Sequence, residues 1–292
     1  MPTTVATHSG PFHADDVLAW ALIRTFFDAD AALIRTRDQA LIETTDIVVD
    51  VGGLYDPATL RFDHHQQEYT GLLSSAGMVL HWLADDGRIT PALAGELRGQ
   101  MVDYVDDVDN GRRMPDTAVP CFALLVSAYN QGCHTLEEFD AAFLRAGEAA
   151  AGMVAGIVAG HTERLASAAT VIAAMDAATA AGQNVIFMDR YHSWKDIYFA
   201  NGGEDHPTEY VVHPGIDGRW RAVGIPPVRG SFAQKRAFPE AWAGLRDEEL
   251  SAVTGVEGAL FCHKNRFIAV FLTREGVLEA MGRFGLLVGF SR

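Results

Sequence analysis

The sequence predicts an α/β protein with two domains: an N-terminal domain built on a mainly parallel sheet, and a smaller C-terminal α+β domain. Two patterns support this prediction. In the first half of the chain, short apolar runs alternate with stretches of helical spacing, the order that builds a parallel sheet covered by helices. In the last third, strand-like runs pair across tight turns. The 292 residues are enough to form two cores, and we place the domains at residues 1–180 and 181–292.

The first half opens with a short apolar strand, which a Gly-Pro break separates from a helix. Asp46–Val51 is a β-branched run that ends at two glycines, as expected of a buried parallel strand. Thr135 and Glu138 form a capping box at the start of an alanine-rich stretch that reads as two helices or one kinked helix. The expected strands are residues 4–7, 32–35 and 46–51, and the expected helices are 15–27, 74–83, 92–108 and 135–182.

The last third is predicted to hold strands at residues 184–188, 209–213, 219–225, 259–263 and 266–272. The second and third of these pair across a Pro-Gly turn, and the last two pair across Lys264-Asn265. A final helix begins after Thr273, whose hydroxyl is a suitable N-cap.

Charge and cysteine content exclude several classes of function. Acidic residues outnumber basic ones by 38 to 23, and the net charge of −15 argues against broad, non-specific coating of nucleic acid. The three cysteines form no C-x-x-C pair, so neither a disulfide framework nor a thiolate zinc site is expected. The N-terminus lacks a secretory pattern, and the longest apolar stretch, Ala149–Gly160, is short for a bilayer. We therefore expect a cytoplasmic protein without a membrane segment.

Histidine and aspartate gather in the loop of residues 8–16, directly after the first strand. Open α/β sheets place their ligands at this edge. Mixed imidazole and carboxylate donors there suit Mn²⁺, Fe²⁺, Mg²⁺ or Zn²⁺. In the alternative interpretation, Asp15 caps the following helix and His13 is merely exposed.

Three further clusters repeat this chemistry. Asp50 closes a strand, where a buried carboxylate needs a positive partner such as a metal ion, although a surface or loop-capping aspartate fits equally well. In Asp63-His64-His65, adjacent histidines of an extended segment point to opposite sides, so that one can bind a metal while the other addresses a substrate. Asp103, Asp106 and Asp109 stand at helical spacing, which favours either a bound cation or a solvated acidic face.

Together these motifs resemble the DHH phosphoesterase superfamily of metal-dependent enzymes. The similarity is closer to the MYG-type exonuclease family, the melanocyte-proliferating-gene family. The motifs that carry it are residues 8–16, 50–57, 74–77, 106–111, 194–195, 244–248 and 273–276, which span nearly the whole chain.

The resemblance implies a DHH-like catalytic domain that hydrolyses phosphodiesters in RNA or short oligonucleotides. It implies two divalent ions as cofactors, with Mn²⁺ favoured over Mg²⁺, Fe²⁺ or Zn²⁺, because such ions activate water for attack on phosphorus. The implied ligands are His8, His13, Asp15, Asp50, His64 and Asp106, with Asp50 bridging the ions and Asp109 as an alternative to Asp106. His65, next to Asp63, would face the scissile phosphate and donate a proton to the leaving group.

The C-terminal domain is expected to close the active cleft and to supply phosphate-binding side chains: Arg236, Arg246, His263 and Arg274. Each arginine could instead cap a helix or form a surface pair. Relatives commonly carry Gly-Gly-His-His in the last hairpin, where this chain reads Ile268–Leu272. This departure leaves open two alternatives, hydrolysis of small substrates such as pyrophosphate and a catalytically silent metal-binding module. The sequence does not determine the oligomeric state, which includes a homodimer among its alternatives.

Overall fold

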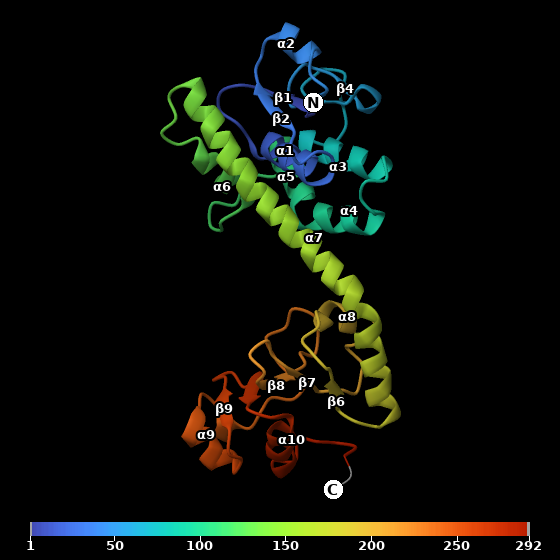
Figure 1. Cartoon of the computed structure of the whole chain (residues 1–292), viewed down its shortest axis with the longest axis vertical. Helices are drawn as coiled ribbons and strands as arrows, with labels where there is room; N and C mark the ends of the chain where they lie inside the picture. The colour runs from blue at the N-terminus through green and yellow to red at the C-terminus, as the bar shows by residue number, and fades with distance from the viewer. Residues whose placement is uncertain (1, 291–292) are drawn as a thin grey trace. The chain divides into compact units, whose positions relative to one another are not determined.

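The structure is a computed structural model that describes residues 2–290. The chain divides into two compact units, residues 1–161 and 162–292 (Figure 1). Helix α7 (Leu136–Ala180) contributes residues to both units. The predicted boundary between residues 180 and 181 stays a prediction.

The first unit is built on a five-stranded sheet in the order β2-β1-β3-β5-β4. Four of its strands run parallel, and β4 pairs with β5 in the antiparallel sense. The predicted mainly parallel sheet is therefore confirmed, whereas the two-residue strands β4 and β5 are too short to show a periodicity in sequence. The strands are β1 (Thr4–Thr7), β2 (Ala32–Arg35), β3 (Ile47–Val49), β4 (Tyr55–Asp56) and β5 (Arg61–Phe62).

Three helices of the first unit pack together beside the sheet (Figure 1). They are α1 (Ala14–Phe26), α3 (Ser75–Asp85) and α5 (Asp103–Asp109). Val17, Val79, Val105 and the strand residue Phe62 are fully buried in one core. This packing fixes the ends of α1, α3 and α5 relative to the strand ends, where the site is built. Helices α2 (Gln39–Glu43) and α6 (Phe122–Tyr129) also belong to this unit.

The helix predicted over residues 92–108 is found as three consecutive segments. A π-helical stretch, η2 (Arg98–Val102), separates α4 (Pro91–Leu97) from α5. A π-turn inserts one extra residue into the helix and is common near functional sites. It therefore changes which side chains share a face, and regular helical spacing cannot predict the result.

Of the two alternatives predicted for the alanine-rich stretch, the structure has one long helix, α7, and not two helices. Its first half places Ala142, Phe143, Ala146 and Ala150 in the core of the first unit. By length and composition alone α7 could cross a membrane, a test that core helices of soluble proteins also pass. The expected absence of a membrane segment stays a prediction.

The second unit is the predicted α+β domain, with a five-stranded sheet in the order β6-β7-β8-β10-β9. Strands β6 and β7 are parallel, and the two predicted hairpins, β7–β8 and β9–β10, are confirmed. Thr273 caps the last helix as predicted, with its Oγ1 accepting from Gly276 N at 3.0 Å. The elements are β6 (Val185–Phe187), α8 (Trp194–Ala200), β7 (Tyr210–Pro214), β8 (Trp220–Gly224), α9 (Asp247–Thr254), β9 (Ala259–Cys262), β10 (Ile268–Phe271) and α10 (Arg274–Arg283).

Candidate metal centre

The loop that follows β1 is held in place by contacts from two other segments. Arg35 Nη2 donates to the carbonyl of Gly10 at 2.7 Å. The side chain of Asn130 forms two hydrogen bonds with the backbone of Phe12. It accepts from the N–H at 3.1 Å and donates to the carbonyl at 2.8 Å. The loop therefore has a fixed course, which carries His8 directly after β1 and places His13 at the N-cap of α1.

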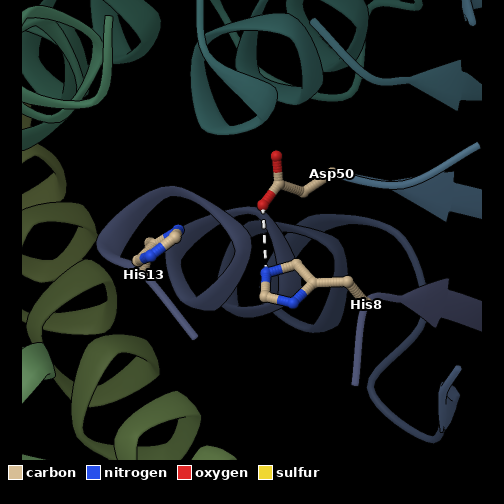
Figure 2. A group of neighbouring side chains, drawn as sticks. All are labelled: His8, His13 and Asp50. Atoms are coloured by element: carbon tan, nitrogen blue, oxygen red, sulfur yellow. Dashed lines mark ion pairs between the residues drawn. The ribbon is translucent and has the colours of Figure 1, made fainter. Parts of the chain in front are cut away.

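Asp50 brings two histidines together at the end of β3. Its φ of 56° lies in the left-handed region, which aspartate enters more readily than most side chains. From there Oδ2 lies 3.3 Å from His8 Nε2, and Oδ1 lies 3.4 Å from His64 Nε2. Figure 2 shows His8 facing Asp50, with His13 at the start of α1 near them. The carboxylate of Asp50 thus stands between two groups of imidazoles, as a bridging ligand would.

His64 points toward three carboxylates. Its Nε2 lies 3.1 Å from Asp109 Oδ2, 3.4 Å from Asp50 Oδ1 and 3.8 Å from Asp15 Oδ2. This nitrogen is buried and forms no well-aligned hydrogen bond with any of them. Burial opposes protonation of the ring, but the neighbouring carboxylates of Asp109 and Asp50 outweigh it and raise the pKa of His64 to about 10.

Asp15 is the carboxylate of this group whose ionised form is most strongly disfavoured by its surroundings. It is fully buried, and its Oδ1 has no hydrogen-bond partner. Burial, followed by the negative charges of Asp50 and Asp109, raises the pKa of Asp15 well above its ordinary value. A divalent cation would satisfy this oxygen and the imidazole of His64 together, so the residues present fit a metal ion.

Three overlapping groups of possible ligands can be recognised among the described residues. Within each group the ligand atoms lie within 4.8 Å of one another. Asp50 belongs to two groups and His13 to two, so the groups form one connected cluster. The groups are His8, His13 and Asp50; Asp50, His64 and His65; and His13, Asp15 and Asp109. The predicted ligands other than Asp106 are thus brought together, and their roles as ligands stay predictions.

Asp106 lies outside these groups. Its carboxylate accepts hydrogen bonds from the start of α3 instead. Ser74 donates to Asp106 Oδ1 through both its N–H, at 2.9 Å, and its Oγ, at 2.6 Å. Gly77 N–H is a further donor to the same side chain. Burial raises the pKa of Asp106 in spite of these bonds. Asp106 thus caps the N-terminus of α3, whereas Asp109, the alternative raised by the sequence, contacts His64.

His65 and Asp63 form a second arrangement at the edge of the cluster. Asp63 Oδ1 accepts from His65 Nδ1 at 2.8 Å, and its Oδ2 accepts from Gly53 N at 2.6 Å. Burial opposes ionisation of Asp63, but these donors outweigh it and lower its pKa. The hydrogen bond to Asp63 in turn raises the pKa of His65. The His65 side chain is 61% exposed and lines a cavity of about 390 Å³ with His8, His13, Asp50, Asp63 and Arg37.

Three polar residues of this site were missed by the sequence analysis. Asp16 Oδ2 lies 3.2 Å from His8 Nε2. Its position three residues after His13, the N-cap of α1, is the sequence signal of a capping box. Ser75 donates to Asp15 through its N–H at 3.3 Å and to Asp50 through its Oγ at 3.2 Å. Arg37, whose Nη2 lies 3.1 Å from His8 Nδ1, follows β2 at the same sheet edge.

The predicted substrate-binding side chains of the second unit are not brought together. Each has a local partner: Arg236 the Gly285 carbonyl, Arg246 the Phe261 ring, His263 the Phe267 ring, and Arg274 the Phe187 and Trp220 rings. Trp220 pairs with the last residue of β10, whereas Phe267 precedes its first residue. Arg274 and His263 therefore lie toward opposite ends of the sheet. Their substrate-binding roles stay predictions.

The buried carboxylate of Asp15 should destabilise the metal-free protein, and this effect can be measured. We expect Asp15→Asn to raise the unfolding temperature of the metal-free protein, because it removes one of several converging buried charges. The same change should reduce the stabilisation produced by Mn²⁺, because a ligand is lost. Thermal unfolding in EDTA and in Mn²⁺ measures both effects, with exposed Asp85→Asn as the control. A lower unfolding temperature in EDTA together with an unchanged Mn²⁺ response would contradict this assignment.

Comparisons with known proteins cover nearly the whole chain. The family model MYG1_exonuc, described as an uncharacterised protein family (UPF0160), matches residues 4–284. The MYG1 protein of Chlamydia pneumoniae is 35% identical over 283 residues, covering 96% of each chain. The MYG1 exonuclease of Homo sapiens is 30% identical over 324 residues, covering 95% of this chain and 84% of the human protein.

A solved structure, exonuclease RecJ bound to manganese, aligns with 97% of this chain and 89% of its own. Its sequence identity is 13% and its TM-score is 0.28. The sequence relatives and the family model, in contrast, agree along the length of the chain and confirm the resemblance that its motifs indicated. The chain therefore belongs to the MYG1_exonuc family.

Proposed function

We propose that this protein is a divalent-metal-dependent phosphodiesterase that acts on RNA or short oligonucleotides in the manner of an exonuclease. The observation that carries the proposal is the convergence of His64 with Asp15, Asp50 and Asp109 at the carboxyl edge of a parallel sheet. The name of the human relative, an exonuclease, supports the choice of substrate.

The proposed cofactors are two divalent ions. Mn²⁺ is favoured, and Mg²⁺, Fe²⁺ and Zn²⁺ are the alternatives. His8, His13 and Asp50 would hold one ion. His64 with its neighbours Asp15, Asp50 and Asp109 would hold the other, so that Asp50 would serve both. Mixed imidazole and carboxylate donors suit these ions. When bound, such ions supply Lewis-acid polarisation of the phosphate and activation of a water molecule.

The protein's own side chains would perform the proton transfer and bind the phosphate. His65 presents its ring to the cavity, and its bond to Asp63 favours the protonated ring. It can therefore donate a proton to the leaving oxygen as a general acid. Arg37 lines the same cavity, and its guanidinium can donate to a phosphate oxygen.

Asp63→Asn tests how His65 is positioned. We expect kcat to fall by about 10–100-fold with little change in KM, because the amide no longer holds the ring in its orientation and charge state. Steady-state kinetics on a trinucleotide measure both constants, and thermal unfolding shows whether the fold is kept. A rise in KM at unchanged kcat would mean that Asp63 serves substrate binding instead.

A panel of divalent ions and substrates tests the proposal as a whole. Mn²⁺, Mg²⁺, Fe²⁺ and Zn²⁺ are each combined with a trinucleotide, a long RNA and pyrophosphate. The proposal expects metal-dependent release of nucleotides that EDTA abolishes. The absence of hydrolysis with every ion on every substrate would leave the catalytically silent module as the better account.

One observation favours small substrates as a second candidate. The segment where relatives commonly carry Gly-Gly-His-His forms strand β10, and its residues Ala269 and Phe271 are buried in the core of the second unit. It therefore provides neither the close backbone approach of glycine nor histidine donors. Faster turnover of pyrophosphate than of the trinucleotide would favour this candidate.

We propose the cytoplasm as the location. Cys121, Cys133 and Cys262 are all free. Burial raises the pKa of Cys262 to about 11, so that it stays a thiol at neutral pH. Free thiols are consistent with a reducing compartment.

A further inference from the structure

A cavity of about 590 Å³ opens in the second unit and is lined by residues of that unit alone. We propose that it binds single-stranded nucleic acid, with a base stacked on Phe232 and a phosphate bound by Lys195 and Arg229. The inference deepens the proposed function, on which it rests for identifying the strand as substrate. It names a strand-binding site formed by different residues from those of the metal centre.

A fixed loop presents Phe232. The ends of the segment 226–234 are joined, because Lys235 N donates to the carbonyl of Ile225 at 2.7 Å. Lys235 Nζ anchors the same end by donating to the carbonyls of Gly203, at 2.6 Å, and His206, at 2.7 Å. Compact surface loops with closed ends are frequently functional.

Three phenylalanines line this one cavity. Phe232 is 98% exposed, and Phe199 and Phe267 are half-buried beside the same space. Single exposed apolar side chains are common and need no explanation. Phe232 is different, because an anchored loop presents its ring, almost fully exposed, at a cavity that two further phenylalanines line. Flat aromatic faces are the surfaces on which single-stranded bases stack, regardless of sequence.

The cations of the cavity suit a phosphate. Lys195 is exposed at the start of α8. Arg229 lies 2.9 Å from Asp196 and is itself 69% exposed. Because Arg229 balances the one acidic residue of the lining, the charge of Lys195 leaves the cavity net positive. Ser231, Gln234 and Asn265 add polar groups that can pair with base edges.

The charge of the chain is unevenly distributed between its two units. Residues 1–161 contain nine basic and 23 acidic side chains, whereas residues 162–292 contain 14 basic and 15 acidic ones. The net charge of −15 therefore resides almost entirely in the unit that holds the carboxylate cluster. The long-range repulsion that argued against nucleic acid is accordingly weak for the second unit.

Binding of a fluorescein-labelled single-stranded oligoadenylate to the full-length protein tests this site. The titration is followed by fluorescence anisotropy in EDTA, where no metal-dependent hydrolysis occurs. We expect Phe232→Ala to weaken binding about tenfold, the loss typical of one stacked base. Lys195→Gln and Arg229→Gln should each reduce the slope of log affinity against log salt by about 0.7, the value for one phosphate contact with a single strand.

Two matched controls come from the same unit. Ile216→Ala removes another fully exposed apolar side chain, in the turn between β7 and β8. Arg283→Gln removes another exposed arginine that pairs with an acidic neighbour, Glu279. Both controls should bind the oligonucleotide as the unaltered protein does.

The outcomes separate this site from the proposed function. Hydrolysis of bis(p-nitrophenyl) phosphate in Mn²⁺ should be unchanged by Phe232→Ala, because that substrate has no strand to anchor. Equal oligonucleotide affinity for Phe232→Ala and the unaltered protein, or no binding in EDTA at all, would overturn the inference whatever the hydrolysis shows. Binding that depends on Phe232 in a protein that hydrolyses no phosphodiester would keep the site and overturn the proposed function.

Discussion

Replacing His64 by alanine is expected to reduce phosphodiester hydrolysis by about 10³-fold or more. His64 is the imidazole toward which Asp15, Asp50 and Asp109 converge. In the proposed metal site, its loss would remove a ligand beside these three carboxylates. Metal ions contribute several kcal/mol of transition-state stabilisation, and each 1.36 kcal/mol corresponds to a factor of ten in rate. Values of kcat/KM on a trinucleotide in Mn²⁺ measure the effect.

His81→Ala is the matched control for this change. His81 lies on α3 with its side chain 53% exposed, and it pairs with Asp85 at the surface. Its removal should change kcat/KM by less than twofold, since a surface pair of this kind contributes little. His64→Gln, which keeps much of the side-chain volume, separates loss of a ligand from loss of packing. Retention of activity within about tenfold of the unaltered protein in both His64 variants would contradict the account.

Gly77→Ala is expected to destabilise the protein and to disturb the site at the same time. A Cβ at this position would overlap the carboxylate of Asp106, which caps α3. Overpacking of this kind costs about 1–3 kcal/mol, and for a chain of this size each kcal/mol lowers the unfolding temperature by about 2–4 °C. Because the shift would move Ser75 away from Asp15 and Asp50, hydrolysis should fall as well.

Gly95→Ala separates this close contact from a general effect of glycine in helices. Gly95 lies in α4, and a Cβ there would meet no heavy atom within 4 Å. Alanine in an open helical position stabilises by about 0.5–1 kcal/mol relative to glycine. Denaturant unfolding of both variants should therefore give changes of opposite sign. Equal effects at residues 77 and 95 would show that the contact with Asp106 carries no energetic weight.

The architecture of the first unit could be predicted because its strands obey simple rules. β1, β2 and β3 are apolar runs bounded by turn residues, and the residues that follow β1 and β3 lie at one edge of a parallel sheet. That rule places His8 and Asp50 at the same edge, and the pairing of β1 with β3 brings them close together. The adjacent pair His64 and His65 does not point to opposite sides, as its extended segment predicted. The two ring centroids lie 4.4 Å apart, and both rings approach Asp50 Oδ1, at 3.4 and 3.5 Å, although His64 is buried and His65 is largely exposed.

Other parts of the site depend on contacts that no local pattern encodes. The choice between Asp106 and Asp109 could not be made from spacing, because a π-helical stretch precedes α5 and resets its faces. Ser75 reaches the carboxylates through the packing of α3 against α1 and the loop after β3. Helices α8 and α9 are each too short to show a clear periodicity.

The central claim is that these imidazoles and carboxylates form one divalent-metal site. Anomalous scattering from crystals of the protein grown with Mn²⁺ tests it most directly. The account predicts manganese peaks in contact with Asp50, one of them also touching His64. Manganese found only at surface carboxylates, with Asp15, Asp50 and His64 contacting no ion at saturating Mn²⁺, would contradict it.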